Sequence, residues 1–289
     1  MEKKLKKLSK RVNFYLSSYL SKFNSSELTA PMKYGLFPGG KKIRSKIIFD
    51  VGNIFNVKNK NLLILAAAVE AIHAYSLIHD DLPCMDDDKL RRGKPSTHIK
   101  YGESTAILAG NSLLTTAFEI LSDKNFRVEE KIKSRLINFL SRCSGQTGIA
   151  GGQYLDLSYE KKKVSLQKIL NMELKKTGKL FEFCCIAPLI IKKNKKNLRS
   201  FSKIGKDIGL LFQIVDDLID FKGKTKHAGK KTKKDIKKGK ATIISLLGYK
   251  NAVKYANKLK QKIYLKLKSH TTKANDLRET IDFIMERTN

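Results

Sequence analysis

The sequence predicts an all-α protein. Its 289 residues include only five prolines, and polar and apolar residues show little of the strict alternation that marks half-buried strands. Apolar residues recur instead with the helical period, over segments of about 15 to 25 residues. Hydrophobic residues make up 41% of the chain, so it can bury a large core. Because no shift in composition marks a boundary, we expect a single domain over residues 1–289.

Each segment with the helical period is expected to form one helix. The segment 60–82 is apolar almost all round, which is typical of the central helix of a large bundle. Joints rich in Gly, Pro or Lys separate the helices, and they include YGLFPGG, LPCMDDDKLRRGKPS, GIAGGQYLDLS and FKGKTKHAGKKTKKDIKKGK. The expected helices span about 2–23, 41–55, 60–82, 102–121, 128–148, 165–187, 195–221, 240–266 and 272–287.

Composition also bounds the compartment. The N-terminal sequence MEKKLKKLSKR has no apolar stretch behind it, so we expect no signal peptide. The most apolar windows, LLILAAAVEAI and CCIAPLII, are too short to span a bilayer. The four cysteines show no paired zinc-ligand spacing and are typical of a reducing compartment. We therefore expect a soluble, cytoplasmic protein.

The formal net charge of +32 raises the hypothesis of a basic, helical nucleic-acid-binding protein. Of the 59 basic residues, 49 are Lys and 10 are Arg; they are spread along the chain, which has no Trp. A nucleic-acid-binding face would interleave basic residues with exposed aromatic ones. A uniform excess of Lys is more typical of nucleotide bias in a genome. The basic field still favours small anionic substrates by steering them.

The first acidic group lies in SLIHDDLPCMDDDKLRRG, which holds five of the 27 acidic residues of the chain. Like charges this close raise one another's pKa unless a cation lies among them. Pro83 disfavours helix at the residue before it, so we expect Asp80 and Asp81 at a helix C-terminal end and Asp86 in the loop beyond. The negative end of a helix dipole disfavours carboxylates unless a cation compensates. This placement indicates a metal site.

The second acidic group is FQIVDDLID, where Asp216 and Asp220 lie one helical turn apart, on one helix face, with Asp217 beside them. Both groups interrupt strongly apolar helices, where solvated surface, the alternative interpretation, is not expected. Two such groups in one bundle indicate carboxylates that face each other across a cavity. Because all the ligands are hard oxygens, with no His or Cys trio nearby, Mg²⁺ is the expected ion.

Basic and polar residues near these groups predict several separate anion contacts. The segment GGKKIR opens a helix, where glycines let the backbone approach a phosphate. The segment 222–240 holds ten lysines and three glycines, as a mobile lid over phosphates would. The remaining candidates are a histidine two turns before Asp80, the two arginines after the first acidic group, and the segment KKTGKL. The residues concerned are Lys41, Arg44, His73, Arg91, Arg92, Lys176 and Thr177.

Together these segments resemble the trans-isoprenyl diphosphate synthases, and among them the bacterial farnesyl diphosphate synthases. The resemblance covers nearly the whole chain, in the order YGLFPGGKKIR, AAAVEAIHAYSLIHDDLPCMDDDKLRRGKPSTH, GESTAILAGNSLL, GIAGGQYLDL, KKTGKL, FQIVDDLID and GKATIISLLG. It implies a single-domain bundle of about ten or more helices around a deep central cavity, usually as a homodimer.

The resemblance also implies a reaction, in which isopentenyl diphosphate condenses head-to-tail with dimethylallyl or geranyl diphosphate to give (2E,6E)-farnesyl diphosphate and pyrophosphate. It implies about three Mg²⁺ ions per active site, with Mn²⁺ able to substitute. It assigns the metal to Asp80, Asp81, Asp86, Asp216, Asp217 and Asp220, and isopentenyl diphosphate to Lys41, Arg44, His73 and Arg92. It assigns contacts with the allylic diphosphate to Arg91, Lys176, Lys230 and Lys240. It assigns stabilisation of the allylic cation to Thr177 and Gln213.

Product length is expected to depend on the helix turn before Asp80. In the family, an aromatic residue five positions before the first aspartate accompanies products of fifteen carbons, and here that residue is Tyr75. Helix geometry alone places Ser76 more directly beneath Asp80. Tyr75 could also be a packed core aromatic. We expect farnesyl diphosphate as the product, with the twenty-carbon geranylgeranyl diphosphate as the alternative.

One departure and two rival hypotheses accompany the resemblance. The family's basic motif usually ends in Pro, and Ser45 stands there instead, which is expected to loosen the start of the helix. A terpene cyclase would replace the second acidic group by an Asn-Ser-Glu type of site, and DDLID argues against that. A catalytically idle scaffold is disfavoured because every metal and phosphate position is filled.

Overall fold

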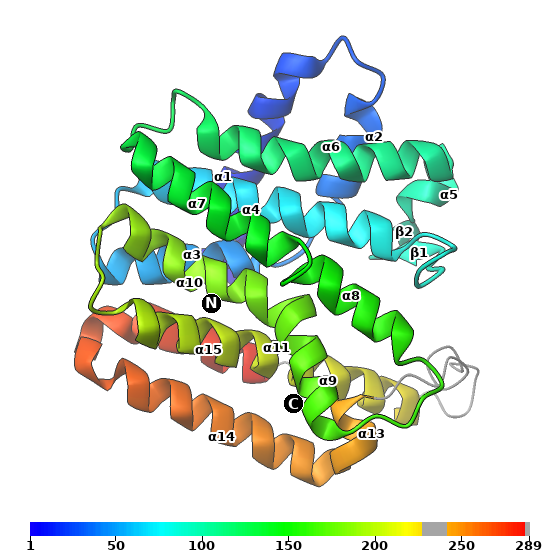
Figure 1. The fold of residues 1–289 in the computed structure, drawn as a ribbon, viewed down its shortest axis with the longest axis vertical. Helices are drawn as coiled ribbons and strands as arrows, with labels where there is room; N and C mark the ends of the chain where they lie inside the picture. The colour runs from blue at the N-terminus through cyan, green and yellow to red at the C-terminus, as the bar shows by residue number, and fades with distance from the viewer. Residues whose placement is uncertain (227–241, 287–289) are drawn as a thin grey trace. The chain divides into compact units, whose positions relative to one another are not determined.

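The computed structural model describes residues 1–226 and 242–286 and places most of them in helices (Figure 1). The expected all-α class is confirmed. Within the described ranges the only strands are β1 (Leu90–Arg91) and β2 (Lys94–Pro95), which pair antiparallel. The chain divides into two compact units, one of Met1–Asn138 with Ile190–Lys193 and one of Phe139–Leu189 with Asn194–Asn289.

The first unit is organised around α4 (Asn59–Asp80), whose side chains are buried on nearly every side from Leu62 to Ile78. This burial follows from its all-round apolar sequence. Helix α4 is also, among the described residues, the one helix long and apolar enough to cross a membrane, but 67% of its apolar window is buried inside the protein, as in a core helix. It packs against α1 (Glu2–Leu20), α2 (Thr29–Leu36), α3 (Ile43–Ile54) and α6 (Glu103–Ser122), and Figure 1 shows α6 running alongside it.

The other elements of this unit are short. Turn η1 (Ser21–Phe23) follows α1, and α5 (Thr97–Tyr101) leads from β2 into α6. Helix α7 (Glu130–Ser144) begins in the first unit and ends in the second. The expected helices at 2–23, 41–55, 60–82 and 102–121 are confirmed to within a few residues.

The second unit is organised around α11 (Leu198–Lys226), which contacts most of the other elements of that unit. Its partners include α14 (Tyr249–Leu267) and a π-helical segment, η2 (Leu174–Gly178), which is also packed against α8 (Ile149–Ser158). The remaining elements are α9 (Leu166–Glu173), α10 (Lys179–Ile191), α13 (Ile243–Leu247), η3 (Lys268–Ala274) and α15 (Asn275–Glu286).

Three predicted elements of the second unit were wrong. The single helix expected at 240–266 is, in its described part, two helices, α13 and α14, which are separated at Gly248, where φ is 74°. The joint expected at GIAGGQYLDLS is helical, because it forms α8. The single helix expected at 165–187 is instead α9, the π segment η2 and α10 in succession. Gly152 connects the last two findings, since a Cβ added there would lie 2.2 Å from the backbone nitrogen of Lys176 in η2. The glycine therefore allows a close approach of two backbones and does not mark a loop.

Candidate active site

The first acidic group closes the C-terminal end of α4. The helix ends at Asp80, as expected, and the next residues fold back over its last turn. The backbone N–H of Asp86 donates to the carbonyl oxygen of Asp80 (2.8 Å), and that of Asp88 donates to the carbonyl oxygen of Asp81 (3.1 Å). Carbonyls that a helix end leaves without partners are thereby satisfied. The fold brings Asp80 and Asp86 next to each other at the backbone.

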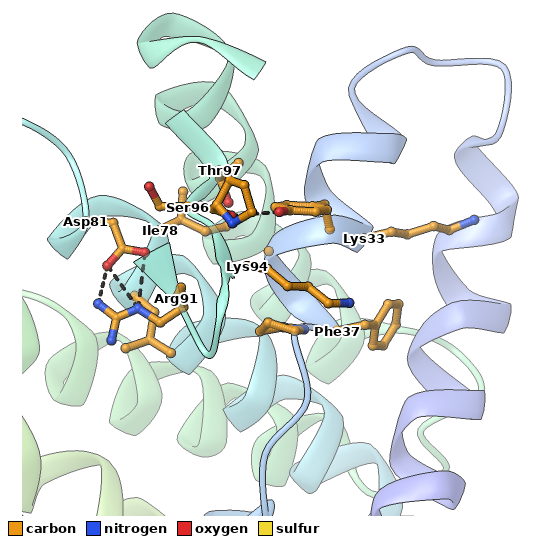
Figure 2. Close-up of a pocket in the computed structure, with 13 residues that line it drawn as sticks. Lys33, Phe37, Ile78, Asp81, Arg91, Lys94, Ser96 and Thr97 are labelled. Atoms are coloured by element: carbon orange, nitrogen blue, oxygen red, sulfur yellow. Dashed lines mark hydrogen bonds and ion pairs between the residues drawn. The ribbon is translucent and has the colours of Figure 1, made fainter. Parts of the chain in front are cut away.

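A two-residue hairpin sends the neighbouring arginines to different places. Its central residues, Arg92 and Gly93, have φ values of 53° and 78°, and positive φ at both positions is the signature of a tight type I′ turn. Arg91, on β1, reaches the buried Asp81 and donates from Nε to both carboxylate oxygens, at 2.9 and 3.2 Å. Figure 2 shows this pair at the edge of a pocket that Phe37 and Lys94 also line.

Arg92 lies against the basic segment, which we define as residues 39–44. Gly40 has a φ of 121°, and a Cβ added to it would lie 2.7 Å from the guanidinium carbon of Arg92. Only glycine allows both this backbone conformation and this contact. Lys42 precedes the first residue of α3 in the left-handed conformation, with φ 50° and ψ 45°. The hairpin and the basic segment therefore place Arg92 beside the start of α3.

His73 joins the basic segment to α4. Its Nε2 lies 3.2 Å from Nη1 of Arg44, and because a guanidinium can only donate, His73 is the acceptor. Burial lowers the pKa of His73 well below its ordinary value, and the charges of Arg44, Lys42, Arg92 and Arg91 lower it further. The ring is therefore neutral near pH 7. Three of the four residues predicted to contact isopentenyl diphosphate are gathered here, and the fourth, Lys41, is exposed in the same segment.

In the second unit, the π segment presents Thr177 to α11. Thr177 Oγ1 donates to Oε1 of Gln213 (3.2 Å), and Nε2 of Gln213 donates to Oδ1 of Asp217 (2.9 Å). This relay fixes the orientation of the Gln213 amide, with its oxygen toward Thr177 and its nitrogen toward the acidic group. Short π segments often occur at functional sites because they place side chains outside the regular α-helical register.

The second acidic group fits a divalent cation. Burial raises the pKa of Asp217 to about 7; Gln213 opposes the shift, and the charges of Asp220 and Asp216 add to it. Oδ2 of Asp217 is buried and accepts no hydrogen bond from any residue that the structure describes. A cation bound here would offset the repulsion among the three carboxylates and would give Oδ2 of Asp217 a partner. The residues present therefore fit Mg²⁺.

Neither acidic group is a complete metal site by itself. Within the described part of the chain, no three His, Cys, Asp or Glu side chains are arranged to hold a metal ion. Mg²⁺ commonly takes only one or two carboxylates from the protein and completes its coordination with phosphate oxygens and water. A site that needs the substrate's diphosphate to bind Mg²⁺ is consistent with this arrangement.

The sequence predicts no role for Asp156, which lies in the segment GIAGGQYLDL. Its Oδ2 lies 2.6 Å from Nζ of Lys176, and both residues are partly buried. Lys176 is therefore held by a carboxylate from α8. Only the helical fold of that segment reveals this contact. Two other predicted residues, Lys230 and Lys240, lie outside the described residues.

The residues expected to form the floor, Tyr75 and Ser76, lie on the last turns of α4. Tyr75 packs edge-on against the ring of His79, with centroids 5.1 Å apart at 81°. His79 in turn contacts the carbonyl oxygen of Ile107 on α6 through Nε2 (3.1 Å). Ser76 is buried and donates from Oγ to the carbonyl oxygen of His73 (2.9 Å). Tyr75 is thus a packed aromatic whose ring orientation is fixed by its neighbour.

Comparison with known proteins decides the family. The polyprenyl synthetase family matches residues 25–283. The chain belongs to the polyprenyl synthetase family. It is 39% identical over 286 residues to the farnesyl diphosphate synthase of Escherichia coli, with 96% of each chain covered. It is 35% identical over 276 residues to the geranylgeranyl diphosphate synthase of Cyanophora paradoxa, covering 95% of this chain and 92% of that protein.

Solved structures agree with this assignment to the polyprenyl synthetases. The geranyltransferase of Helicobacter pylori, in complex with magnesium and isoprenyl diphosphate, covers 96% of this chain and 96% of its own, with a TM-score of 0.76 and 29% identity. As a polyprenyl synthetase of matching length, the chain is a trans-prenyltransferase.

Proposed function

We propose that the protein condenses isopentenyl diphosphate with dimethylallyl diphosphate, and then with geranyl diphosphate, to give (2E,6E)-farnesyl diphosphate. The observation that carries the proposal is the pairing, within the first unit, of an aspartate-rich helix end with a separate basic segment. A cluster of carboxylates suits a diphosphate that binds together with a metal ion. A cluster of basic residues suits a second diphosphate that binds without metal. An enzyme that joins two diphosphate substrates needs both.

In this proposal the basic segment binds isopentenyl diphosphate. Lys41, Arg44 and Arg92 supply the positive charge, and the neutral His73 orients Arg44 by accepting from it. A neutral imidazole adds no repulsion between the cations and can itself donate from its other nitrogen. The diphosphate is not the leaving group in this substrate, so the contacts serve to bind and orient it.

The allylic diphosphate is proposed to bind at the acidic groups, through Asp80, Asp81, Asp86, Asp216, Asp217 and Asp220, with contacts from Arg91, Lys176, Lys230 and Lys240. Mg²⁺ bound there supplies positive charge that stabilises the departing diphosphate. The allylic C–O bond breaks and its electron pair leaves with the diphosphate. Thr177 and Gln213 present fixed oxygen dipoles to the allylic cation, and the hydrogen bond between them keeps these dipoles oriented.

The new bond then forms between the allylic carbon and the terminal alkene carbon of isopentenyl diphosphate. The inner alkene carbon is left as a tertiary cation. The CH2 group next to it is proposed to lose a proton to pyrophosphate, and the electron pair of that C–H bond forms the new double bond. Tyr75 is proposed to limit the product to fifteen carbons, because its ring is held in place by His79. The similarity to a geranylgeranyl diphosphate synthase keeps the twenty-carbon product as the alternative.

Incubation with Mg²⁺, labelled isopentenyl diphosphate and geranyl diphosphate tests this proposal, with chromatography of the dephosphorylated products. Farnesol is the expected main product. A mainly twenty-carbon alcohol would contradict the product length, and no condensation product at all would contradict the function.

Three related features are part of the same proposal: one catalytic domain over residues 1–289, a homodimer and a cytoplasmic location. Exposed apolar side chains support the dimer, since Ile107 and Leu108 on α6 are 41% and 55% exposed and Ile99 precedes them at 50%. Light scattering after gel filtration is expected to give twice the chain mass of 32.8 kDa.

A further inference from the structure

Ser45 is a departure from the family pattern, and the structure gives it a partner. The residue is fully buried in the first turn of α3, and its Oγ donates to Oε1 of Glu70 (2.7 Å). The other carboxylate oxygen, Oε2, lies 3.1 Å from Nζ of Lys42. Glu70 is 3% exposed in the middle of α4. Both of its carboxylate oxygens therefore have partners at the start of α3. The expected loosening of this helix start is therefore not what the contacts indicate.

Glu70 is charged despite its burial. Burial by itself would raise its pKa, but the Lys42 charge and the Ser45 hydrogen bond outweigh burial, with Arg44 adding to them, and hold the pKa below its ordinary value. A buried carboxylate with a hydroxyl donor and an ammonium partner has well-defined geometry. Removing either donor would leave it incompletely satisfied.

The ion pair with Glu70 gives Lys42 a different role from that of the adjacent Lys41. The Lys42 side chain is only 8% exposed and points to Glu70, whereas Lys41 is exposed. Lys42 has a left-handed backbone conformation directly before the first residue of α3. Glu70 and His73 lie three residues apart on α4 and so share a helix face. That face therefore holds the basic segment at two points, through Ser45 and Lys42 at Glu70 and through Arg44 at His73.

We propose that Glu70 and Ser45 are positioning residues that hold the basic segment ready to bind the diphosphate of isopentenyl diphosphate. In this inference the Ser45 hydroxyl, through Glu70, fixes the first turn of α3 at the position where the family's basic motif is expected to end in Pro. The inference rests on the proposed function for the identity of the diphosphate. The placement of Arg44 before substrate arrives lowers the ordering cost of binding.

Calorimetric titration with isopentenyl diphosphate in buffer containing EDTA tests the inference, because this diphosphate is proposed to bind without metal. For Ser45→Ala we expect binding about three- to tenfold weaker, since a charge-assisted hydrogen bond is lost but Arg44 remains. The KM for isopentenyl diphosphate should rise by a similar factor, while the KM for geranyl diphosphate stays near the wild-type value. In the Arg44→Ala background, adding Ser45→Ala should weaken binding by a smaller factor than it does in the wild-type protein, because the part of its effect that depends on the placement of Arg44 is already lost.

Asp50→Asn is the matched control. Asp50 forms a buried ion pair with Lys46 one turn further along α3, so its loss perturbs the same helix away from the basic segment. This control should lower the midpoint of thermal unfolding but leave the binding of isopentenyl diphosphate unchanged. Glu70→Gln is the second variant; it keeps an acceptor for Ser45 and removes the charge opposite Lys42.

The outcomes separate the inference from the proposed function. Wild-type affinity in a folded Ser45→Ala protein would overturn the inference, and so would equal weakening by Ser45→Ala and Asp50→Asn. If Glu70→Gln does not fold, Ser45→Ala still decides. A wild-type protein that binds isopentenyl diphosphate but forms no condensation product would overturn the proposed function and leave the positioning role standing.

Discussion

The substitution Gly152→Ala probes whether the π segment must lie where it does. An added Cβ would lie 2.2 Å from the nitrogen and 2.5 Å from the Cα of Lys176. Ordinary contact begins at 3.4 Å, so the backbones of α8 and η2 would have to separate by about 1.2 Å. Because both elements are helical backbone, no side-chain rotation can relieve the clash. If the π segment shifts, Thr177 moves relative to Gln213 and Lys176 moves relative to Asp156.

A displacement of about 1 Å at a positioning group can reduce turnover by about a hundredfold. We therefore expect kcat for farnesyl diphosphate formation to fall by about that factor in Gly152→Ala. Overpacking should also destabilise the fold by about 1–3 kcal/mol. Initial rates at saturating substrates measure the first effect, and chemical denaturation followed by circular dichroism measures the second.

Ala150→Gly is the control for this experiment. Ala150 is exposed in the first turn of the same helix, and glycine there weakens α8 by at most about 1 kcal/mol without adding atoms. If loss of helix stability alone explained a low kcat, both variants would lose activity alike. A folded Gly152→Ala enzyme with wild-type kcat would show that the position of the π segment does not matter for catalysis.

Three other predictions concern named side chains. Asp80→Ala and Asp216→Ala should each lower kcat by orders of magnitude with an unchanged circular dichroism spectrum; activity retained in either variant would remove that residue from the metal site. Tyr75→Ala should lengthen the product beyond fifteen carbons by chromatography, and an unchanged product would show that Tyr75 is only a core aromatic. The folded protein keeps His73 neutral, whereas in the unfolded chain this residue binds a proton at acid pH. The free energy of unfolding should therefore fall by about 1 kcal/mol from about pH 7.5 to about pH 5.5. Denaturant titrations at several pH values should show a smaller fall in the free energy of unfolding for His73→Gln than for the wild-type protein. An equal pH dependence in the two proteins would refute the assignment of this effect to His73.

The helices of the first unit could be predicted because their periodicity is local information. Helix α4 is apolar all round and ends just before Pro83, so both its burial and the position of Asp80 follow from adjacent residues. The π segment could not be predicted in this way. A π segment of five residues is too short to be recognised from the apolar pattern of 165–187, and its close contact with Gly152 joins residues that are distant in sequence.

The site shows the same division. The sequence identifies the aspartates and basic residues as groups, because their types and spacing carry the chemistry. It does not identify which donor is paired with which carboxylate, since Lys176 and Asp156 are 20 residues apart and Ser45 and Glu70 are 25 apart. Those pairs depend on how helices pack. For the same reason, Asp156 and Glu70 received no role from the sequence.

The pairing of Arg91 with Asp81 has a consequence for how the site responds to salt. A surface lysine takes its counterions from solution, and an incoming anion releases them, so binding weakens as salt rises. Arg91 carries its counterion within the protein, on a side chain 10 residues away in sequence. A diphosphate that contacts Arg91 therefore exchanges one covalently tethered carboxylate for another anion, and bulk ions take little part. On a chain with a formal charge of +32, this internal exchange makes the proposed diphosphate contact of Arg91 less sensitive to ionic strength than a contact with an exposed lysine would be.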